Sequence, residues 1–386
     1  MDDFPKNLQI KLDSRTKDNS MRRLGTSTQL IDFSSNDYLG FSTSEEIYSR
    51  ALQILKENAL QHNGASGSRL LTGNHKVYTM AENYLANVNN ADAALIFNSG
   101  FDANLGLLSS VPQRGDLILY DEFCHASIRD GIRMSNAKAL KFEHNNLEHL
   151  TTIAERERAS HNEIYVVTES VFSMDGNAPD LKAMTALCTR LKLRLIVDEA
   201  HALGVVGTGK GLIYEQGLEK HIFARVLTFG KALGCHGAAI LGSHTLIEYL
   251  VNFSRSFIYT TALPPHAVAS ILAAYEQLSS AEGIKRVKAL KNNIEMFRSS
   301  VGNNQQSERF LTSDSAIHSC IIPTNEVVKA VSEKLKTKGY DVRPILSPTV
   351  PMGQERLRIC VHSYNTEAQI NSLCNILKDE LNEIAL

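Results

Sequence analysis

The stretch VLTFGKALGCHG, residues 226–237, places Lys231 directly after a short apolar run and between glycines. Lysine side chains normally keep their ammonium group in water, because burying an unpaired charge is costly. A lysine flanked by glycines and apolar residues therefore suggests a chemical task. Taken alone, Lys231 could equally be a surface residue at the end of a strand, so the surrounding sequence has to decide.

A carboxylate and an imidazole follow an earlier apolar run. The run LRLIV at 193–197 predicts a buried strand, and Asp198 and His201 come directly after it in DEAHALG. In open α/β sheets, ligands bind in the crevice at the carboxyl ends of the parallel strands. We therefore expect Asp198, His201 and Lys231 to face one crevice.

The pattern of apolar residues predicts an α/β fold. Short apolar runs of strand length alternate with longer amphipathic stretches, which is typical of a mostly parallel central sheet with helices on both faces. Helices are predicted at 6–24, 45–59, 77–88, from Asp102, and at 180–191, and strands at 93–97, 117–120, 164–168, 193–197 and 238–241.

The length of 386 residues allows one large domain and one smaller domain. We expect an N-terminal arm at 1–45, a large cofactor-binding domain at 46–280, and a smaller α+β domain at 281–386. In the last helix of the smaller domain, apolar residues recur at spacings of three and four, which gives one apolar face.

Composition excludes several classes of partner. The formal net charge is −2, so no overall field favours nucleic acid or an anionic membrane. Six cysteines lie far apart without a Cys-x-x-Cys pair, which argues for reduced thiols and against a zinc site. The chain starts with an acidic segment that lacks an apolar signal core, and no run of about 18 apolar residues occurs, so we expect a cytoplasmic protein.

The chemical groups predicted at the strand ends fit one cofactor. Pyridoxal phosphate needs an amine for its aldehyde, a carboxylate for its ring nitrogen, a flat group against the ring and donors for its phosphate. The free amides at the start of the helix after NSGF, residues 98–101, are suited to a phosphate. The other groups are Lys231, Asp198, His125, His201, Ser173 and Thr228.

Two other classes of protein remain to be weighed. Residues 198–201 spell DEAH, and GVVGTGK at 204–210 imitates the phosphate loop of a nucleotide-driven motor. The imitation fails at Gly211, where a Ser or Thr must hold magnesium, and it fails in order, because a phosphate loop should precede the acidic box. A binding module without catalysis is the third class, and it is favoured only if Lys231 is dispensable.

The motifs, taken in order, resemble those of the α-oxoamine synthases, pyridoxal phosphate enzymes of the aspartate aminotransferase fold type I. The resemblance implies condensation of an amino acid with an acyl-CoA, with release of carbon dioxide and CoA. It extends over nearly the whole chain and rests on SSNDYLG (34–40), NSGF (98–101), HAS (125–127), VFSMDG (171–176), DEAH (198–201), TFGK (228–231) and PTVP (348–351).

The resemblance implies roles for individual residues in binding the cofactor. Lys231 would hold the cofactor aldehyde and move the α-proton of the substrate, Asp198 would face the ring nitrogen, and His125 would stack on the ring. The remaining cofactor contacts that it implies are Gly100, Phe101, Ser173, His201 and Thr228.

The resemblance also implies substrate contacts and a homodimer. Arg356 matches the arginine that binds the amino-acid carboxylate, a task suited to the planar guanidinium group. A segment with Thr260 and Thr261 would reach the phosphate of the partner subunit. The other substrate contacts implied are Asn36, in the first motif, and Arg22 and Thr349, on the acyl side.

One position departs from the family pattern. Many members carry Arg-Pro before Pro-Thr-Val-Pro, whereas this chain has Leu346 and Ser347 there. Arg343, three residues before Leu346, is a candidate replacement. Without a replacement, the acyl chain would be shorter or would lack a terminal carboxylate, so the choice of amino acid, acyl group and thioester carrier stays open.

Overall fold

A computed structural model describes residues 4–22, 24, 29–302 and 307–384. The chain forms two compact units, a larger unit of Asn36–Ser173 and Asn177–Leu290 and a smaller unit of Met1–Ser35, Met174–Gly176 and Lys291–Leu386. The division expected from the sequence, 1–45, 46–280 and 281–386, stays a prediction.

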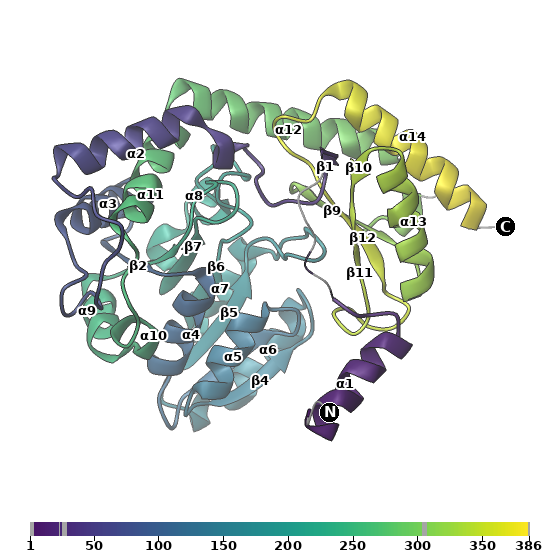
Figure 1. Ribbon diagram of the computed structural model, residues 1–386. Coiled ribbons are helices and arrows are strands. Elements are labelled where there is room, and N and C mark those ends of the chain that lie inside the picture. The colour runs from purple at the N-terminus through teal and green to yellow at the C-terminus, as the bar shows by residue number, and fades with distance from the viewer. Residues whose placement is uncertain (1–3, 23, 25–28, 303–306, 385–386) are drawn as a thin grey trace. The chain divides into compact units, whose positions relative to one another are not determined.

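A seven-stranded sheet forms the centre of the larger unit (Figure 1). Its strand order is β2-β8-β7-β6-β5-β3-β4, and only β8 runs against the others. The predicted mostly parallel sheet is therefore confirmed. The strands are β2 (Ala93–Phe97), β3 (Leu117–Asp121), β4 (Lys138–Phe142), β5 (Ile164–Glu169), β6 (Arg194–Asp198), β7 (Ala224–Thr228) and β8 (Ala238–Gly242).

Both faces of this sheet are covered by helices, because successive side chains of a strand point to opposite faces. In β6, Ile196 packs into one hydrophobic cluster, while Leu195 and Val197 pack into another. The first cluster contains side chains of α4 (Gly100–Ser110), α5 (Ala126–Met134), α9 (His244–Phe253) and α10 (Arg255–Ile258), and the second those of α6 (Leu147–Glu157), α7 (Leu181–Leu191) and α8 (Leu212–Gln216).

Most predicted helices of the larger unit are confirmed, with shifted ends. Asp180 caps α7 as predicted, because its side chain accepts a hydrogen bond from Ala183 N–H at 3.0 Å. The helix expected from Asp102 begins two residues earlier, after Ser99. The other elements are α2 (Glu45–Glu57), α3 (Lys76–Val88) and α11 (Pro265–Leu278), and the short 3-10 turns η1 (Phe41–Thr43), η2 (Arg158–Ser160) and η3 (Glu219–His221).

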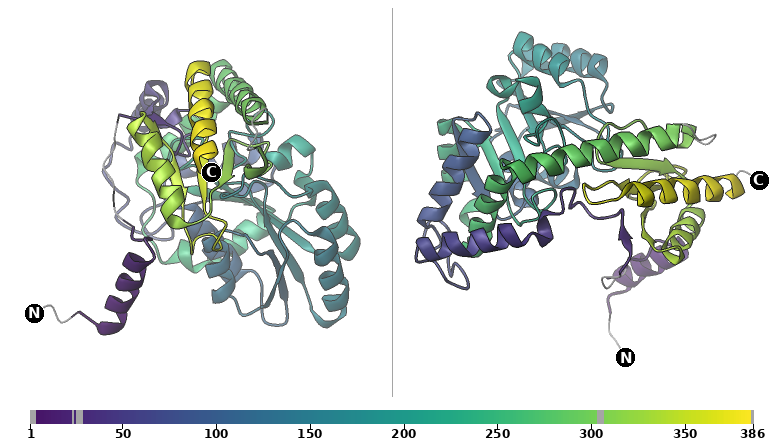
Figure 2. Two further views of the ribbon diagram at one scale, coloured as in Figure 1. Left: turned by 90° about the vertical axis from the view of Figure 1, so that its right-hand side faces the viewer. Right: turned by 90° about the horizontal axis from the view of Figure 1, so that it is seen from above.

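The smaller unit has an α+β fold, as predicted. Its antiparallel sheet has the order β11-β12-β9, and β1 pairs separately with β10. Figure 2 shows α13 and α14 side by side, and Lys334 joins them through Glu380 at 2.6 Å. The elements are α1 (Lys6–Lys17), β1 (Ile31–Asp32), α12 (Ala281–Gly302, which begins in the larger unit), η4 (Ser307–Arg309), β9 (Ile317–Ile321), α13 (Asn325–Thr337), β10 (Tyr340–Asp341), β11 (Arg343–Ile345), β12 (Arg356–Cys360) and α14 (Glu367–Ile384).

The predicted helix at 6–24 was too long. Helix α1 ends at Lys17, and the next residues leave the helical conformation, with Asn19 at a φ of +49°. Asn tolerates this left-handed conformation better than most residues, so the Asp18-Asn19 pair stops the helix.

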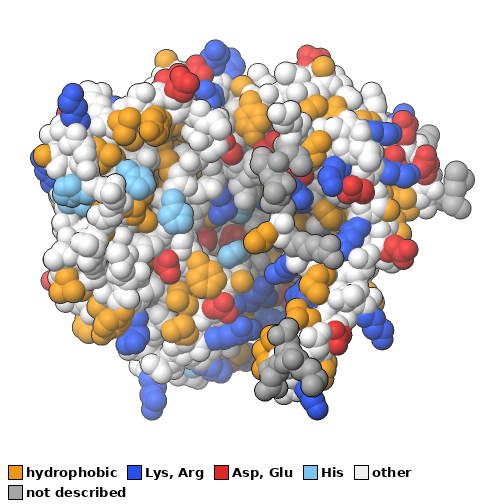
Figure 3. Space-filling model, in the orientation of Figure 1, with side chains coloured by type: hydrophobic (Ala, Val, Ile, Leu, Met, Phe, Trp, Pro, Cys, Tyr) orange, Lys and Arg blue, Asp and Glu red, His pale blue; other side chains and the backbone are white. Residues whose placement is uncertain are grey.

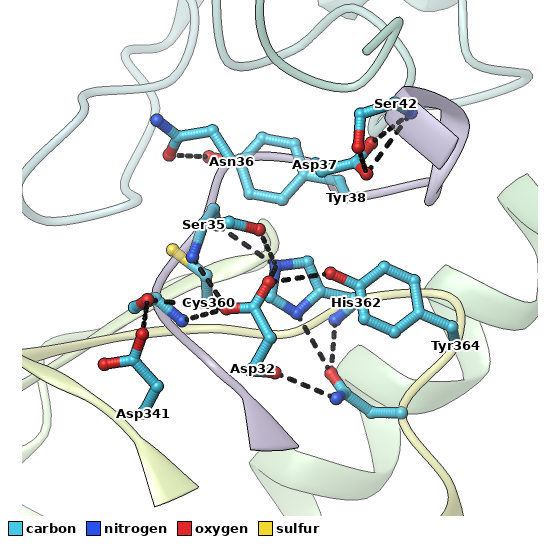
Figure 4. A network of polar contacts seen from close by, with 12 residues as sticks. Asp32, Ser35, Asn36, Asp37, Tyr38, Ser42, Asp341, Cys360, His362 and Tyr364 are labelled. Carbon is cyan, nitrogen blue, oxygen red and sulfur yellow. Dashed lines mark hydrogen bonds and ion pairs between the residues drawn. The ribbon is translucent and has the colours of Figure 1, made fainter. Parts of the chain in front are cut away.

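Asp32 fixes the end of β1 in the smaller unit (Figure 4). One carboxylate oxygen accepts the backbone N–H groups of Ser34 at 2.8 Å and Ser35 at 2.9 Å, and the other accepts the Tyr364 hydroxyl at 2.9 Å. Burial alone would raise the pKa of Asp32, but the nearby His362 and the hydrogen bonds from Ser35 and Ser34 lower it to about 2. The chain therefore enters the SSNDYLG motif from a tightly bonded turn.

Because His318 on β9 is buried, we expect the free energy of unfolding to fall at acidic pH. Its side chain is 4% exposed, and burial, together with the positive charge of Arg298, lowers its pKa from 6.5 to about 3. Below pH 6.5 the unfolded chain binds a proton that the folded chain does not, so stability falls as the pH drops from 6.5 toward 3. At pH 5 the loss from this group should be about 2 kcal/mol.

Urea denaturation at pH 7 and pH 5 measures this loss. His318→Leu should lose less stability between the two pH values than the wild type, by about 2 kcal/mol. His62→Leu, at an exposed histidine, is the matched control and should keep the wild-type pH dependence. Equal pH dependence in wild type and His318→Leu would contradict the prediction.

The surface is mixed in charge. On the face drawn in Figure 3, basic, acidic and hydrophobic side chains are interspersed. Among the described residues, no helix has the length and apolar character needed to cross a membrane, and no group of His, Cys, Asp and Glu side chains is arranged to hold a metal ion.

Candidate active site

Asp198 lies at the carboxyl end of β6 and is 5% exposed. One carboxylate oxygen accepts a hydrogen bond from the Asn104 side chain at 2.7 Å, and the other accepts Ala200 N–H at 2.9 Å. These contacts hold the carboxylate in one orientation. The sequence did not point to Asn104, because it lies one turn into α4 without any motif of its own.

A second buried carboxylate, Glu169, lies beside Asp198. The two residues are partners in the pairing of β5 with β6, and Glu169 accepts His125 N–H at 2.6 Å. Burial and the negative charge of Asp198 raise the pKa of Glu169 well above its usual range. Glu169 therefore holds its proton more tightly than an exposed glutamate does, and it anchors the backbone of His125. Its signal in the sequence, an acid ending the apolar run IYVVTE, was overlooked.

His125 caps the start of α5 and remains partly exposed. Its Nδ1 accepts Ser127 N–H at 3.2 Å, which leaves Nε2 as the N–H donor of the neutral ring. Burial and the positive charge of Lys231 lower the pKa of His125, although Asp198 acts in the opposite direction. The ring is therefore a neutral hydrogen-bond donor near pH 7.

Lys231 follows β7, the strand next to β6. Its Nζ donates to the Thr228 hydroxyl at 3.2 Å, and Thr228 donates to the Ala200 carbonyl at 3.4 Å. The turn after it closes through Gly234 N–H to the Lys231 carbonyl, with Gly234 at a φ of +61°. The structure thus brings together Lys231, Thr228 and Ala200, two residues after Asp198.

The start of α4 packs directly on Thr228. A side chain at Gly100 would place its Cβ 2.5 Å from Thr228 Cγ2, so only glycine fits there. Ser99 caps the helix by accepting Asp102 N–H at 3.1 Å. The first amides of a helix have no acceptor within the helix, so those of Gly100 and Phe101 suit an anion.

Thr260 and Thr261 lie beside this same turn within the single chain. Asn98 donates to the Thr260 hydroxyl at 3.0 Å and to the Thr261 carbonyl at 2.8 Å. Their predicted contact with a partner subunit stays a prediction.

His201 is linked to the SSNDYLG motif through Tyr38. The buried Tyr38 hydroxyl lies 2.8 Å from His201 Nδ1 and donates to Asn36 Oδ1 at 3.1 Å. Asn36 and His201 are thus joined by one side chain that the sequence did not single out. Ser173, another predicted contact, ends the first segment of the larger unit.

The other predicted substrate contacts belong to the smaller unit. Arg356 on β12 is buried and forms an ion pair with Asp175. Arg22 donates to the Thr349 hydroxyl at 3.4 Å. Arg343, the candidate replacement at the departing loop, is mostly exposed and pairs with Asp341 at 2.9 Å.

The DEAH sequence has a structural explanation. Glu199 is fully buried, with one carboxylate oxygen on the guanidinium of Arg225 and the other accepting Ile213 N–H at 2.9 Å. A Cβ at Gly211 would lie 2.7 Å from Glu199 Oε1. The acid and the glycine therefore serve internal packing, which removes the basis for a nucleotide motor.

The larger unit offers the groups that pyridoxal phosphate requires. An amine and a hydroxyl follow β7, a hydrogen-bonded carboxylate ends β6, and a neutral imidazole precedes α5. Because Gly100 packs closely on Thr228, the backbone amides at the start of α4 lie next to these groups. The donor set at this edge of the sheet fits the cofactor.

Comparison with known proteins gives the family. Residues 28–377 match the family described as Aminotransferase class I and II, and the chain belongs to it. An 8-amino-7-oxononanoate synthase of Emericella nidulans is 39% identical over an alignment of 394 positions, which covers 97% of this chain and 96% of that relative.

Two solved structures are similar over nearly the whole chain. The 8-amino-7-oxononanoate synthase of Francisella tularensis has a TM-score of 0.78 at 29% identity and covers 92% of this chain and 99% of its own. A serine palmitoyltransferase of S. paucimobilis, bound to a PLP adduct of myriocin, has a TM-score of 0.88 at 25% identity and covers 98% of both chains. The protein is thus a fold type I enzyme of the α-oxoamine synthase group, and its cofactor is pyridoxal 5′-phosphate.

Proposed function

We propose that the protein condenses L-alanine with a pimeloyl thioester, on CoA or a carrier protein, to give 8-amino-7-oxononanoate in biotin biosynthesis. The observation that carries this is the placement of Asp198 and of the Lys231–Thr228 pair at the ends of neighbouring parallel strands. The motif SRLLTGN at 68–74, VFSMDG at 171–176 and the compact length resemble this member of the group most. The similarity to the synthase of Emericella nidulans supports the same choice.

Bound pyridoxal phosphate withdraws electrons from the α-carbon of the amino acid, which eases loss of a proton and of carbon dioxide. Lys231, as a neutral amine, removes the α-proton. The α-carbon then forms a bond to the acyl carbon while the C–S bond breaks and the thiolate leaves. The carboxylate departs as carbon dioxide, and the α-carbon then takes back a proton from the Lys231 ammonium group.

The remaining residues bind and orient. His125, with its Nε2 as donor, would stack on the cofactor ring and would donate to the acyl oxygen. Asp198 keeps the ring nitrogen protonated, and Arg356 binds the amino-acid carboxylate. Ring and phosphate contacts would come from Gly100, Phe101, Ser173, His201 and Thr228. Asn36 would contact the substrate, and Arg22 and Thr349 would contact it on the acyl side.

We further propose a homodimer in the cytoplasm whose only ligands are small molecules or an acyl carrier. Thr260 and Thr261 would contact the phosphate bound by the partner subunit. Their position beside the turn at Ser99 is compatible with a shared phosphate site, because Asn98 already joins that turn to them.

Leu346 and Ser347 favour a second candidate function. Without an arginine at this loop, glycine could be joined to a shorter acyl group, as in glycine C-acetyltransferase or 5-aminolevulinate synthase. Arg343 pairs with Asp341, so it would have to exchange that partner to bind a terminal carboxylate.

A substrate panel separates these functions. Purified enzyme should be given glycine, alanine or serine with acetyl-, succinyl- or pimeloyl-CoA, and released CoA measured as free thiol. We expect alanine with pimeloyl-CoA to react fastest, by about tenfold or more over the other pairs, since one missing methylene contact costs about 1–3 kcal/mol and about 1.4 kcal/mol corresponds to a factor of ten. A preference for glycine with a short acyl group would overturn the biotin assignment.

A further inference from the structure

Arg356 is held at two of its three guanidinium nitrogens. Nε donates to the Gln354 carbonyl at 2.9 Å, and Nη1 binds the carboxylate of Asp175. Neither contact uses Nη2. Arg356 is 5% exposed and Asp175 is 7% exposed, so the ion pair is buried within the smaller unit.

Asp175 itself lies in a firmly fixed segment. Ser319 donates to the Met174 carbonyl at 2.5 Å, and Ser313 donates to the Gly176 carbonyl at 3.0 Å. Gly176 has a φ of +76°, and a Cβ there would lie 2.1 Å from the Ile317 carbonyl oxygen. The three residues 174–176 are thus bound on both sides of Asp175 by residues of the smaller unit.

We propose that Asp175 is a positioning residue, which fixes the guanidinium of Arg356 so that Nη2 is presented to the α-carboxylate of the amino-acid substrate. The inference rests on the proposed function, in which Arg356 binds that carboxylate. A free arginine side chain has several rotamers, and ordering it costs free energy each time a ligand binds. Asp175 and the Gln354 carbonyl order the Arg356 side chain when the protein folds, so substrate binding does not have to supply that free energy.

The alternative is that Asp175 competes with the substrate, since both offer a carboxylate to the same guanidinium. The two roles have opposite consequences. Removing a competitor tightens substrate binding, whereas removing a positioning group weakens it. The rigid attachment of residues 174–176 favours positioning, because a competitor has to move away when the substrate arrives.

The test compares two amines that differ only in the carboxylate. Alanine and ethylamine are titrated into the pyridoxal phosphate-loaded enzyme, and binding is followed by the change in visible absorption without any acyl thioester. In the wild type, alanine should bind more tightly than ethylamine. In Asp175→Ala, alanine affinity should fall about tenfold, the effect of losing one charge-assisted hydrogen bond, while ethylamine affinity changes less than about twofold.

Further variants keep the result interpretable. Asp175→Asn retains an acceptor for Nη1, so its alanine affinity should lie between those of wild type and Asp175→Ala. Asp314→Asn removes an exposed carboxylate paired with Arg298 in the same unit and should change neither affinity. Because each preparation is measured with both amines, a folding defect lowers both affinities and is recognised as such.

Arg356→Gln tests whether Arg356 binds the substrate carboxylate at all, independently of the role of Asp175. If Arg356→Gln leaves the preference for alanine over ethylamine unchanged, the proposed role of Arg356 is wrong. If Arg356→Gln abolishes the preference but Asp175→Ala keeps it or strengthens it, only the positioning role is overturned.

Discussion

Lys231→Ala should fold, bind pyridoxal phosphate only reversibly, and lose at least about 10³-fold in the condensation rate, the scale of losing a positioned general base. Lys231 Nζ is 3.2 Å from the Thr228 hydroxyl, and Thr228 packs on the start of α4 at Gly100. In the proposed function, this amine would hold the cofactor aldehyde and move the α-proton. Treatment of the wild type with borohydride should abolish its visible band and attach the cofactor to the protein.

The measurement is mass spectrometry after borohydride treatment. The wild type should gain the mass of the reduced cofactor on the peptide that contains Lys231, and Lys231→Ala should gain none. Lys210→Ala is the control, because Lys210 ends the loop that imitates a phosphate loop and donates to Tyr214 at 3.2 Å. It should keep the bound cofactor and the rate. An unchanged amount of attached cofactor in Lys231→Ala would contradict the assignment.

Glu199→Gln should lower the free energy of unfolding by about 3–5 kcal/mol, the usual cost of breaking a buried ion pair. The carboxylate accepts two hydrogen bonds from Arg225, at 2.7 Å and 3.0 Å, and Arg225 also donates to the Asn89 carbonyl. Glu199 is 0% exposed and Arg225 is 3% exposed. The amide leaves the arginine charge buried without a counterion.

Urea denaturation of two comparison variants tests the cause. Glu199→Leu combined with Arg225→Met removes both charges and should recover part of the loss, because a buried apolar pair has no charge to desolvate. Glu163→Gln breaks the exposed pair with Arg194 and should cost at most about 1 kcal/mol. If Glu199→Gln lost no more than Glu163→Gln, the pair would have no special structural role.

The sequence predicted the positions of site residues best where the local apolar pattern and the sheet topology agree. Buried parallel strands read as continuous apolar runs, so the apolar pattern by itself locates the ends of β6 and β7, and with them Asp198 and Lys231. Glu169 was missed because it matters through its position opposite Asp198 on the neighbouring strand. The sequence of a single strand does not specify the register in which it pairs with the next one. Asn104 reaches Asp198 from a helix that starts far earlier in the chain.

The pairing of Asp175 with Arg356 was equally hidden, although both residues lay in recognised motifs. They are 181 residues apart, and only the return of residues 174–176 to the smaller unit joins them. The DEAH sequence is the opposite case, in which a motif suggests a function that the structure does not support. Its letters match a nucleotide motor, but the partners of Glu199 are an arginine and a backbone amide inside the core.

The pairing of β2 with β8 means that an early strand waits for a partner that is synthesised much later. Among the described strands, β2, the apolar sequence AALIF, pairs with β8 alone, whose last residue is Gly242. At translation rates of 5–20 residues per second, about 7 to 30 seconds pass between the two strands leaving the ribosome's active centre. During that interval the growing chain carries an apolar strand whose hydrogen-bonding partner does not yet exist, so protection of this segment falls to its neighbouring helices or to chaperones.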